Sequence, residues 1–546
     1  MREEKYTKTE PEEHFDEYED DLDREIEEEE EARKRAKREK RRAENETALA
    51  DDVRFSLKWG VLLIICALVI IGLLVAALLY LTGGLASFGI GEKYTRTETE
   101  AATETETDTE PVSTMSGEEF DAYVMEQIET ADRLAAMYDY DAAADCLREI
   151  PDYETYEAIE ERIAEYEETK ESLVVWDNNA EITHIFFHSL IYDEGLAWSS
   201  SKASDYNQNM ATVDEFLQII ETMYEEGYVL VSLHDVASLE GDEDGYVRMN
   251  YQTISLPPGK IPFVLSQDDV CYYEYMEGHG FASRLVLEDG KVTTEMDLAD
   301  GTVKRGSYDL IPLLDDFIEE HPDFSYRGAK GIIGVTGYEG IFGYRTSAYN
   351  FGEESTSTYY EPNANIEADR QTASQIAAAL KADGWEIASH SWGHPKLGQC
   401  SDERFYWDTD MWESEVEPLV GETDILLYPN GDDVGSWRPY SEGQAGYERV
   451  AYLENAGFHY FCTVDSAQYW VQKGSDWLRQ GRRNIDGTRM YQAIVAEDYL
   501  SDLFDAASVF SSLRPTPVGS IVPKETENAE ETDISSETEN TSAADE

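Results

Sequence analysis

Two neighbouring carboxylates end an apolar, strand-like segment of this sequence. In IPFVLSQDDVCYY, Asp268 and Asp269 directly follow the apolar run. A second stretch, WEIASHSWGHPK, places His390 and His394 after another strand-like run, with three residues between them. Two imidazoles and one carboxylate are a common catalytic ligand set for a divalent metal that leaves one position open for water. Because adjacent strand residues point to opposite faces, we expect one aspartate to bind metal and the other to face the substrate.

The spacing of the two histidines does not by itself distinguish a metal site from two ordinary histidines. Residues four apart lie on one face of a helix, where both imidazoles reach one ion. Pro395 disfavours helical backbone at the residue before it, so we expect the pair on a turn between a strand and a helix. A lone pair of this spacing is more often two surface or hydrogen-bonded histidines. The acidic strand end in the same predicted unit favours the metal site.

From about residue 174, strand-like runs alternate with helix-like ones, which is the pattern of βα units around a parallel sheet. HIFFHSLIY, IPFVLSQDD, AKGIIGVTG and WEIASHSWGH are among the strand-like runs. The stretch SRLVLEDGKVTTEMDLADGTVKRG has two Asp-Gly pairs and predicts a β-meander inserted after the strand that carries the aspartates. In parallel α/β folds reactive groups collect at the carboxyl ends of strands, where these aspartates and histidines fall. The predicted fold class is α/β.

The segments SQDD and HSWGH resemble the first two motifs of the polysaccharide deacetylases of the NodB-homology family, carbohydrate esterase family 4. Those motifs read Thr-Phe-Asp-Asp and His-Ser/Thr-x-x-His. The resemblance implies an irregular (β/α) barrel over roughly residues 180–470, with the meander as an insertion. It also implies that Asp268 is the general base. Asp269, His390 and His394 would then hold a divalent metal, with zinc expected before other transition metals.

The third motif of that family, usually Arg-x-Pro-Tyr, corresponds to LYPNG and departs from it. Leu427 stands at the arginine position and Asn430 at the tyrosine position. The backbone N–H of Asn430 is still expected to face the oxyanion, because this donor does not depend on the side chain. Tyr428 and Asn430 are therefore the candidate substrate and oxyanion residues. Gln267 is a departure in the first motif.

Most members of the family supply the general acid from a histidine near the carboxyl end, where this chain has only His459 after His394. One subset, resembling the poly-N-acetylglucosamine deacetylases, is circularly permuted and carries this histidine at a strand end before the aspartates. The segment IFFH is similar to that pattern and proposes His188 as the acid. The following TVDEFLQIIETMYEEGYVLVSLHDV also resembles that subset.

The function implied by the resemblance is metal-dependent hydrolysis of N-acetyl groups from amino sugars of a cell-wall or surface polysaccharide. An N-acetylated glycan polymer is thus the expected partner. The departures at Gln267, Leu427 and Asn430 leave open a carbohydrate-binding or wall-sensing protein that has lost activity. A glycoside hydrolase is disfavoured, because its paired carboxylates stand about 5 to 10 Å apart across a sugar, whereas Asp268 and Asp269 are adjacent and diverge.

A charge-free run near the amino terminus predicts a membrane anchor. WGVLLIICALVIIGLLVAALLYL contains 23 residues, 59–81, and as a helix it spans a hydrocarbon core of about 30 Å. The run is longer than the apolar region of a signal peptide. A cluster of Lys and Arg at 33–58 precedes it, which predicts a cytoplasmic amino terminus and an extracytoplasmic catalytic domain. The cluster is explained as an orientation signal, so nucleic-acid binding is not expected.

Much of the net charge of −73 lies in segments with too few apolar residues to fold. The predicted organisation comprises a charged cytoplasmic tail (1–57), the transmembrane helix (58–82), an acidic Thr/Glu-rich spacer (83–115), a tetratricopeptide-like helical hairpin module (116–172), the deacetylase domain (173–514) and a disordered tail (515–546). For the helical module a spacer role is favoured over contact with a protein partner. The cysteines outside the membrane segment lack CxxC spacing and are expected to be buried free thiols.

Overall fold

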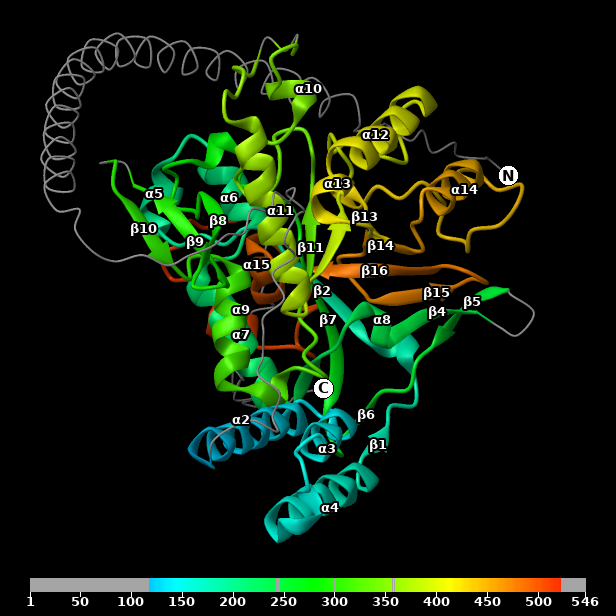
Figure 1. Cartoon of the computed structure of the whole chain (residues 1–546). Coiled ribbons are helices and arrows are strands. Elements are labelled where there is room, and N and C mark those ends of the chain that lie inside the picture. The colour runs from blue at the N-terminus through cyan, green and yellow to red at the C-terminus, as the bar shows by residue number, and fades with distance from the viewer. Residues whose placement is uncertain (1–116, 242–245, 299–300, 356, 358, 522–546) are drawn as a thin grey trace, which may run out of the picture. The chain divides into compact units, whose positions relative to one another are not determined.

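The computed structural model describes residues 117–521 except 242–245, 299–300, 356 and 358 (Figure 1). All of these residues belong to the compact unit Asp108–Glu546. The expected tail, membrane helix and spacer at 1–115 lie outside the described residues. Within the described part, none of the helices combines the length and apolar character needed to cross a membrane.

Seven strands form a closed parallel barrel, which confirms the expected (β/α) barrel architecture (Figure 1). Each strand pairs in parallel with the next around the ring, and β11 pairs with β7 to complete it. The barrel strands are β2 (Thr183–Phe187), β7 (Ile261–Gln267), β11 (Ile332–Val335), β12 (Glu386–Ser389), β13 (Ile425–Leu427), β14 (Tyr460–Val464) and β16 (Leu478–Asn484). Two further strands pair with the barrel strands, β3 (Tyr228–Leu230) parallel to β7 and β15 (Trp470–Lys473) antiparallel to β16.

The barrel strands alternate their side chains between two apolar clusters. On β7, Phe263 and Leu265 belong to the larger cluster shared with the surrounding helices, whereas Val264 belongs to a second cluster with residues of β11–β14 and β16. This alternation follows from the two-residue period of a strand. Because both faces are buried, most barrel strands read as continuous apolar runs. The exception is β16, LRQGRRN, which is buried although most of its residues are polar.

Helices surround the barrel and also connect its strands. Figure 1 shows α7 and α9 side by side on one flank, with α11 nearby. The helices of the barrel domain are α5 (Glu194–Ser199), α6 (Ala203–Asn209), α7 (Val213–Glu225), α8 (Leu233–Val236), α9 (Leu310–Glu320), α10 (Ala348–Phe351), α11 (Ile366–Ala382), α12 (Asp402–Glu415), α13 (Glu417–Val420), α14 (Tyr447–Asn455), α15 (Gly487–Val495) and α16 (Ala506–Val509). Short 3₁₀ helices are η2 (Tyr153–Thr155), η3 (Asn179–Glu181), η4 (Glu274–Met276), η5 (Pro322–Phe324) and η6 (Pro429–Gly431).

The predicted meander is confirmed as a three-stranded antiparallel sheet inserted after β7. Its strands are β8 (Arg284–Glu288), β9 (Lys291–Asp297) and β10 (Val303–Gly306). The remaining strands of the described residues form two small antiparallel pairs: β4 (Ala237–Gly241) with β5 (Val247–Tyr251), and β1 (Val174–Val175) with β6 (Ser255–Leu256).

In the described residues before the barrel, from 117 on, three helices share a small core of their own. They are α2 (Gly117–Ala136), α3 (Tyr140–Arg148) and α4 (Glu157–Glu171), and residues such as Ala131, Leu147 and Ile159 form their shared core. The turn after α2 also contacts the barrel domain, because Tyr138 donates to the carbonyl of Asp323 at 2.7 Å. This part of the chain is therefore packed on the barrel domain through that turn.

The packed chain extends beyond residue 514, the boundary expected from the sequence. Arg514 is fully buried and pairs with Glu215 of α7, with Nη2 2.5 Å from Oε2. Val518 is also fully buried. Arg514 lies at the end of the expected domain, and Val518 shows that packed residues continue a few positions past it. Residues 522–546 of the expected tail lie outside the described residues. The cysteines of the described part, Cys146, Cys271, Cys400 and Cys462, are free, and two of them are buried.

Candidate active site

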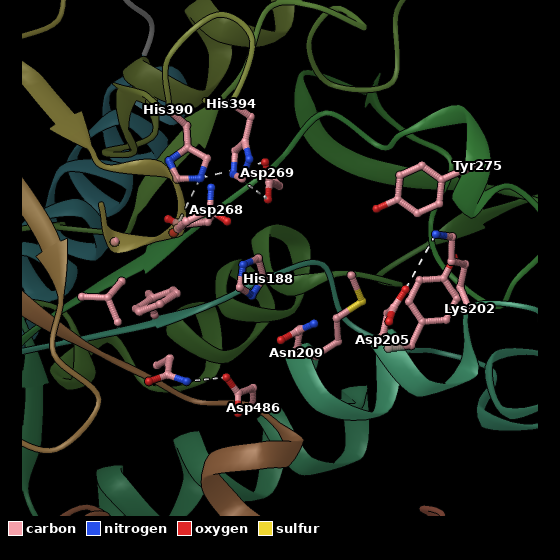
Figure 2. A pocket seen from close by; sticks show the side chains of 17 residues that line it. His188, Lys202, Asp205, Asn209, Asp268, Asp269, Tyr275, His390, His394 and Asp486 are labelled. Atoms are coloured by element: carbon pink, nitrogen blue, oxygen red, sulfur yellow. Dashed lines mark hydrogen bonds and ion pairs between the residues drawn. The ribbon is translucent and has the colours of Figure 1, made fainter. Parts of the chain in front are cut away.

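The carboxyl ends of several barrel strands meet around one cavity, where most of the candidate residues lie (Figure 2). Asp268 and Asp269 follow β7, His188 follows β2, and His390 follows β12. The cavity has a volume of about 380 Å³, which is within the range of small-molecule sites. The barrel thus brings together side chains that are far apart in the sequence.

Asp269, His390 and His394 face one another across a gap. His394 Nε2 lies 3.8 Å from Asp269 Oδ2, and His390 Nε2 lies 4.0 Å from Asp269 Oδ1. One ligand atom of each residue lies within 4.8 Å of the other two. Atoms that share a zinc ion at about 2.0 to 2.2 Å are separated by about 3 to 4 Å. The donor types and their separations therefore fit a divalent metal such as zinc.

Both aspartates line the same cavity, although the alternation of a strand would send them to opposite faces. The reason is that β7 ends at Gln267 and Asp269 has a φ of 59°, in the left-handed region. His394 likewise has a φ of 54°. Such backbone costs about 1 to 3 kcal/mol for a residue other than glycine and persists only where its surroundings impose it. The strained positions coincide with two of the three candidate metal ligands.

A backbone hydrogen bond fixes the orientation of the His390 ring. Its Nδ1–H donates to the carbonyl of Leu427 at the end of β13, at 2.8 Å. The proton is therefore on Nδ1, which leaves the Nε2 lone pair directed at the gap. Burial lowers the pKa of His390, and the neutral imidazole that results is the form that binds metal.

The loop between His390 and His394 is held by a buried carboxylate of α12. Asp408 accepts the backbone N–H groups of Trp392 at 2.8 Å and Gly393 at 2.9 Å. The predicted turn between a strand and a helix is confirmed, since this loop connects β12 with α12.

Asp268 is bound by an arginine inside the barrel. Arg482 of β16 donates from Nη1 to Oδ1 at 2.7 Å and from Nη2 to Oδ2 at 2.9 Å, and its side chain is fully buried. Burial alone would raise the pKa of Asp268, but Arg482, helped by His390, outweighs it and holds the pKa well below its usual range. Asp268 is therefore ionised, and the fork of Arg482 fixes the plane of its carboxylate.

Asp269 has a different partner. The hydroxyl of Tyr273 donates to its Oδ1 at 2.6 Å. Burial again opposes ionisation, but the neighbouring His394 and His390 outweigh it and lower the pKa of Asp269. The second oxygen of this carboxylate faces His394.

His188 lies in the cavity below the two aspartates in Figure 2, close to Asp486. Its ring packs edge-on against Phe186, with the ring centroids 5.8 Å apart. Burial raises the pKa of Asp486, which accepts the backbone N–H of Arg489 at 2.7 Å. The other acid considered, His459, precedes β14 and donates from Nδ1 to the carbonyl of Asp476, at the amino end of the barrel. Only His188 of these two histidines reaches the cavity.

The two residues of the third motif have different positions. Asn430 lines the cavity and has a φ of 55°. Tyr428 is fully buried, with its hydroxyl 3.1 Å from that of Tyr440. The structure thus brings Asn430 to the site and leaves the side chain of Tyr428 in the core.

Arg482 and Asp486 belong to the site but did not stand out in the sequence. Both lie on or just after β16, whose polar composition hides it from a search for apolar runs. The sequence did offer one signal. An arginine that points into a barrel, such as Arg482 in LRQGRRN, needs a buried carboxylate as its counter-charge.

One family model matches part of this chain. Residues 355–449 match a family model described as polysaccharide deacetylase, and this range contains His390, His394 and Asn430. A search of curated proteins found no match to this chain.

Three solved structures are similar over part of the chain. Deacetylase PplD of Streptococcus pyogenes, in complex with acetate, has 13% identity and a TM-score of 0.29, with 58% of this chain and 95% of that chain covered. The putative polysaccharide deacetylase BA0330 of Bacillus anthracis and the polysaccharide deacetylase BC0361 of Bacillus cereus each have 10% identity. Their TM-scores are 0.30 and 0.29, and each comparison covers 61% of this chain and 70% of that chain. Likeness at these scores supports no conclusion about the site.

Proposed function

Because the chain carries a polysaccharide deacetylase domain and is thus a deacetylase, we propose that it removes N-acetyl groups from amino sugars of a cell-wall or surface polysaccharide in a metal-dependent reaction. The observation that supports this most strongly is the convergence of Asp269, His390 and His394 beside the ionised Asp268 in one cavity. Three protein ligands with a remaining open position are typical of catalytic zinc sites.

In the proposed mechanism Asp269, His390 and His394 would hold a divalent ion. When bound, such an ion polarises the amide carbonyl and makes water more acidic. Asp268 takes a proton from the attacking water, and Arg482 keeps this carboxylate oriented and ionised for that step. The ion pair with Arg482 makes Asp268 a weaker base. Asp268 therefore contributes mainly by holding the attacking water in position.

Departure of the amine requires a proton on the sugar nitrogen. We assign this transfer to His188, which lines the same cavity. The amide C–N bond breaks as His188 gives up its proton, and the products are acetate and a sugar with a free amine. The backbone N–H of Asn430 remains the candidate donor to the developing oxyanion.

The catalytic domain is proposed to act outside the cytoplasmic membrane, anchored by the helix expected at 59–81. The support is the long apolar run with Lys and Arg concentrated before it. Protease added to intact cells should then remove the region after residue 90 and leave the basic amino-terminal tail. Protection of the catalytic region in intact cells would contradict this orientation.

An inactive carbohydrate-binding protein is the alternative, motivated by Gln267 and the altered third motif. Gln267 is fully buried, and its Nε2 donates to both oxygens of Asp309 at 3.0 Å. It does not line the cavity, so this departure leaves the proposed catalytic groups in place and favours an active enzyme.

Acetate release from a panel of purified N-acetylated polymers tests the proposal. The panel contains peptidoglycan, poly-N-acetylglucosamine and chitooligosaccharides, each with and without a chelator. We expect release from at least one polymer, abolished by the chelator and restored by zinc. Binding of a polymer without any acetate release would support the inactive alternative.

A further inference from the structure

Three polar side chains are buried inside the barrel and do not line the catalytic cavity. They are His184 on β2, Ser266 on β7 and Gln480 on β16, and all three are fully buried. The strands that carry them are neighbours in the barrel, in the order β16, β2, β7 (Figure 1). We call His184, Ser266 and Gln480 the interior polar cluster.

Apolar residues occupy the neighbouring positions on the same face of these strands. Ile182, Val264 and Leu478 each lie two residues before a member of the interior polar cluster and belong to the second apolar cluster. Side chains two residues apart on a strand share a face, so the polar cluster points the same way. Replacing both partners of a buried hydrogen bond by apolar groups of the same shape is often nearly neutral for stability. Stability alone therefore does not explain polar residues at these positions.

The hydrogen bonds of the cluster have a defined direction. Gln480 Oε1 can only accept and lies 2.5 Å from His184 Nδ1, so Nδ1 carries the ring proton. His184 Nε2 is then an acceptor, and the Ser266 hydroxyl donates to it at 2.9 Å. Burial, together with the nearby charge of Arg482, lowers the pKa of His184 to about 3. The ring is therefore neutral, as one donating and one accepting nitrogen require.

The cluster ends on the arginine that binds Asp268. Ser266 Oγ accepts from Arg482 Nη1 at 2.9 Å, and the same guanidinium group donates to both oxygens of Asp268. Because arginine has no acceptor, Ser266 must direct a lone pair at Arg482 and its proton at His184. Among the described residues, Ser266 and Asp268 are the only side chains that accept from Arg482. Ser266 thus fixes the guanidinium group from a side that Asp268 does not reach.

Strand β2 supplies two histidines at different depths of the barrel. His188 follows the strand and lines the cavity, whereas His184 lies four residues earlier. At about 3.3 Å per residue the two are about 13 Å apart along the chain. His184 therefore has no contact with a substrate in the cavity, and any effect it has on the reaction must pass through Ser266 and Arg482.

We propose that His184 is a positioning residue for the deacetylation. As a neutral acceptor it fixes the Ser266 hydroxyl, which holds Arg482 and, through it, the carboxylate of Asp268 in the orientation that takes a proton from water. Loss of His184 should then lower turnover without changing how substrate or metal binds. This inference rests on the proposed deacetylase function.

The test replaces His184 by side chains that keep or lose the acceptor at Nε2. His184→Gln keeps an acceptor near the position of Nε2, the shorter His184→Asn places its amide near Nδ1 instead, and His184→Leu has no acceptor. We expect His184→Gln to keep kcat near the wild-type value. The other two variants should lower kcat about tenfold or more, since a hydrogen bond to a charged group contributes roughly that factor.

Activity is measured as acetate release from the polymer of the panel above on which wild type is fastest. KM and metal content should match wild type in all three variants. Wild-type kcat in His184→Leu would overturn the inference. So would an equal fall in His184→Gln and His184→Leu, because the acceptor would then be irrelevant.

Ile185→Val is the matched control for a purely structural role. Ile185 is the neighbour of His184 on β2, is fully buried and belongs to the larger apolar cluster shared with the surrounding helices. Ile185→Val should lower the melting temperature and leave kcat unchanged. A fall in kcat as large as that of His184→Leu would show that any disturbance of β2 slows the reaction, which would overturn the inference.

Ser266→Ala tests the path from His184 to Arg482. It should lower kcat about as much as His184→Leu. The double variant should be no slower than Ser266→Ala alone, because both substitutions act on the same chain of hydrogen bonds. Two effects that multiply in the double variant would overturn the inference.

The position of the ring proton separates this inference from the proposed function. Nitrogen NMR of the full chain in detergent, with isotope-labelled histidine and His184→Gln for assignment, reports it without any substrate. We expect a neutral His184 with its proton on Nδ1 and an Nε2 signal that shifts in Ser266→Ala. A proton on Nε2, or no shift, overturns the inference even in an active enzyme. The expected signals without acetate release from any polymer overturn the proposed function alone.

Discussion

The two ends of the barrel each bring histidine and carboxylate side chains together, but with different geometry. At the amino end, His234 of α8 contacts Glu386 through Nδ1 and lies 3.1 Å from Asp424 through Nε2. At the carboxyl end, the Nε2 atoms of His390 and His394 lie 3.8 to 4.0 Å from carboxylate oxygens of Asp268 and Asp269, which is too far for a hydrogen bond. Both nitrogens of His234 are already used in hydrogen bonds, whereas the carboxyl end retains a gap the size of an ion. The two clusters contain the same residue types, and the distance between imidazole nitrogen and carboxylate oxygen distinguishes them.

The histidines at the two ends of the barrel also differ in their pKa values. Burial alone would lower the pKa of His234, but its hydrogen bonds to Asp424 and Glu386 raise it to about 10. Burial lowers the pKa of His390. We therefore interpret the amino-end cluster as a charged structural bridge and the carboxyl-end cluster as a ligand set.

The largest expected effect comes from removing a candidate ligand. Asp269→Ala, His390→Ala or His394→Ala should each abolish stoichiometric metal and activity, because two protein ligands are too few for an open site. Metal content per chain is measured on each purified variant. His234→Ala is the control from the amino end and should keep its metal. One ion per chain in all three ligand variants would show that the ligand set is wrong.

The second prediction compares His188 and His459, the two histidines considered as the general acid. His188→Ala should lower turnover by about 10² to 10⁴ with unchanged metal content, the usual range for loss of one acid–base group. His459→Ala, at the amino end, should keep normal turnover. Acetate release and metal content are measured on both. Full activity of folded His188→Ala would return the assignment of the acid to His459 or another group.

Arg482 and Arg483 are adjacent on β16 but have partners in different environments. Arg482→Met should cost about 3 to 5 kcal/mol of unfolding free energy, because it leaves the buried Asp268 without its counter-charge. Arg483→Met should cost less, since its partner Asp502 is 58% exposed and can be solvated by water. Urea unfolding monitored by circular dichroism gives both values. Equal losses would contradict the difference in burial on which this prediction rests.

The smallest effect concerns the pH dependence of stability. His234 has a pKa raised above its unfolded value of about 6.5, so its contribution is complete below that pH and is lost as pH rises toward about 10. His234→Gln should flatten the decline of melting temperature over this range. The side chain is 40% exposed, so screening by solvent keeps the effect modest. If the melting temperature of His234→Gln fell with pH as steeply as that of wild type, groups other than His234 would be responsible for the decline.

The sequence predicted the barrel strands that are apolar and the motifs at their ends. It did not reveal β16, because the polar residues of LRQGRRN are buried by pairing with distant partners; Arg482 and Asp268 are 214 positions apart. It also placed the two aspartates on opposite faces, since a left-handed φ at Asp269 is not visible from residue types. Tyr428 was expected at the substrate, but its side chain packs into the core against Tyr440.

The most direct test of the central claim is anomalous diffraction at the zinc edge from a crystal of the zinc-loaded protein. The account predicts a peak bound by Asp269, His390 and His394, at about 2.0 to 2.2 Å from each ligand atom, and no peak at His234. Absence of zinc between these three residues, or zinc bound instead by His234, Glu386 and Asp424, would contradict it.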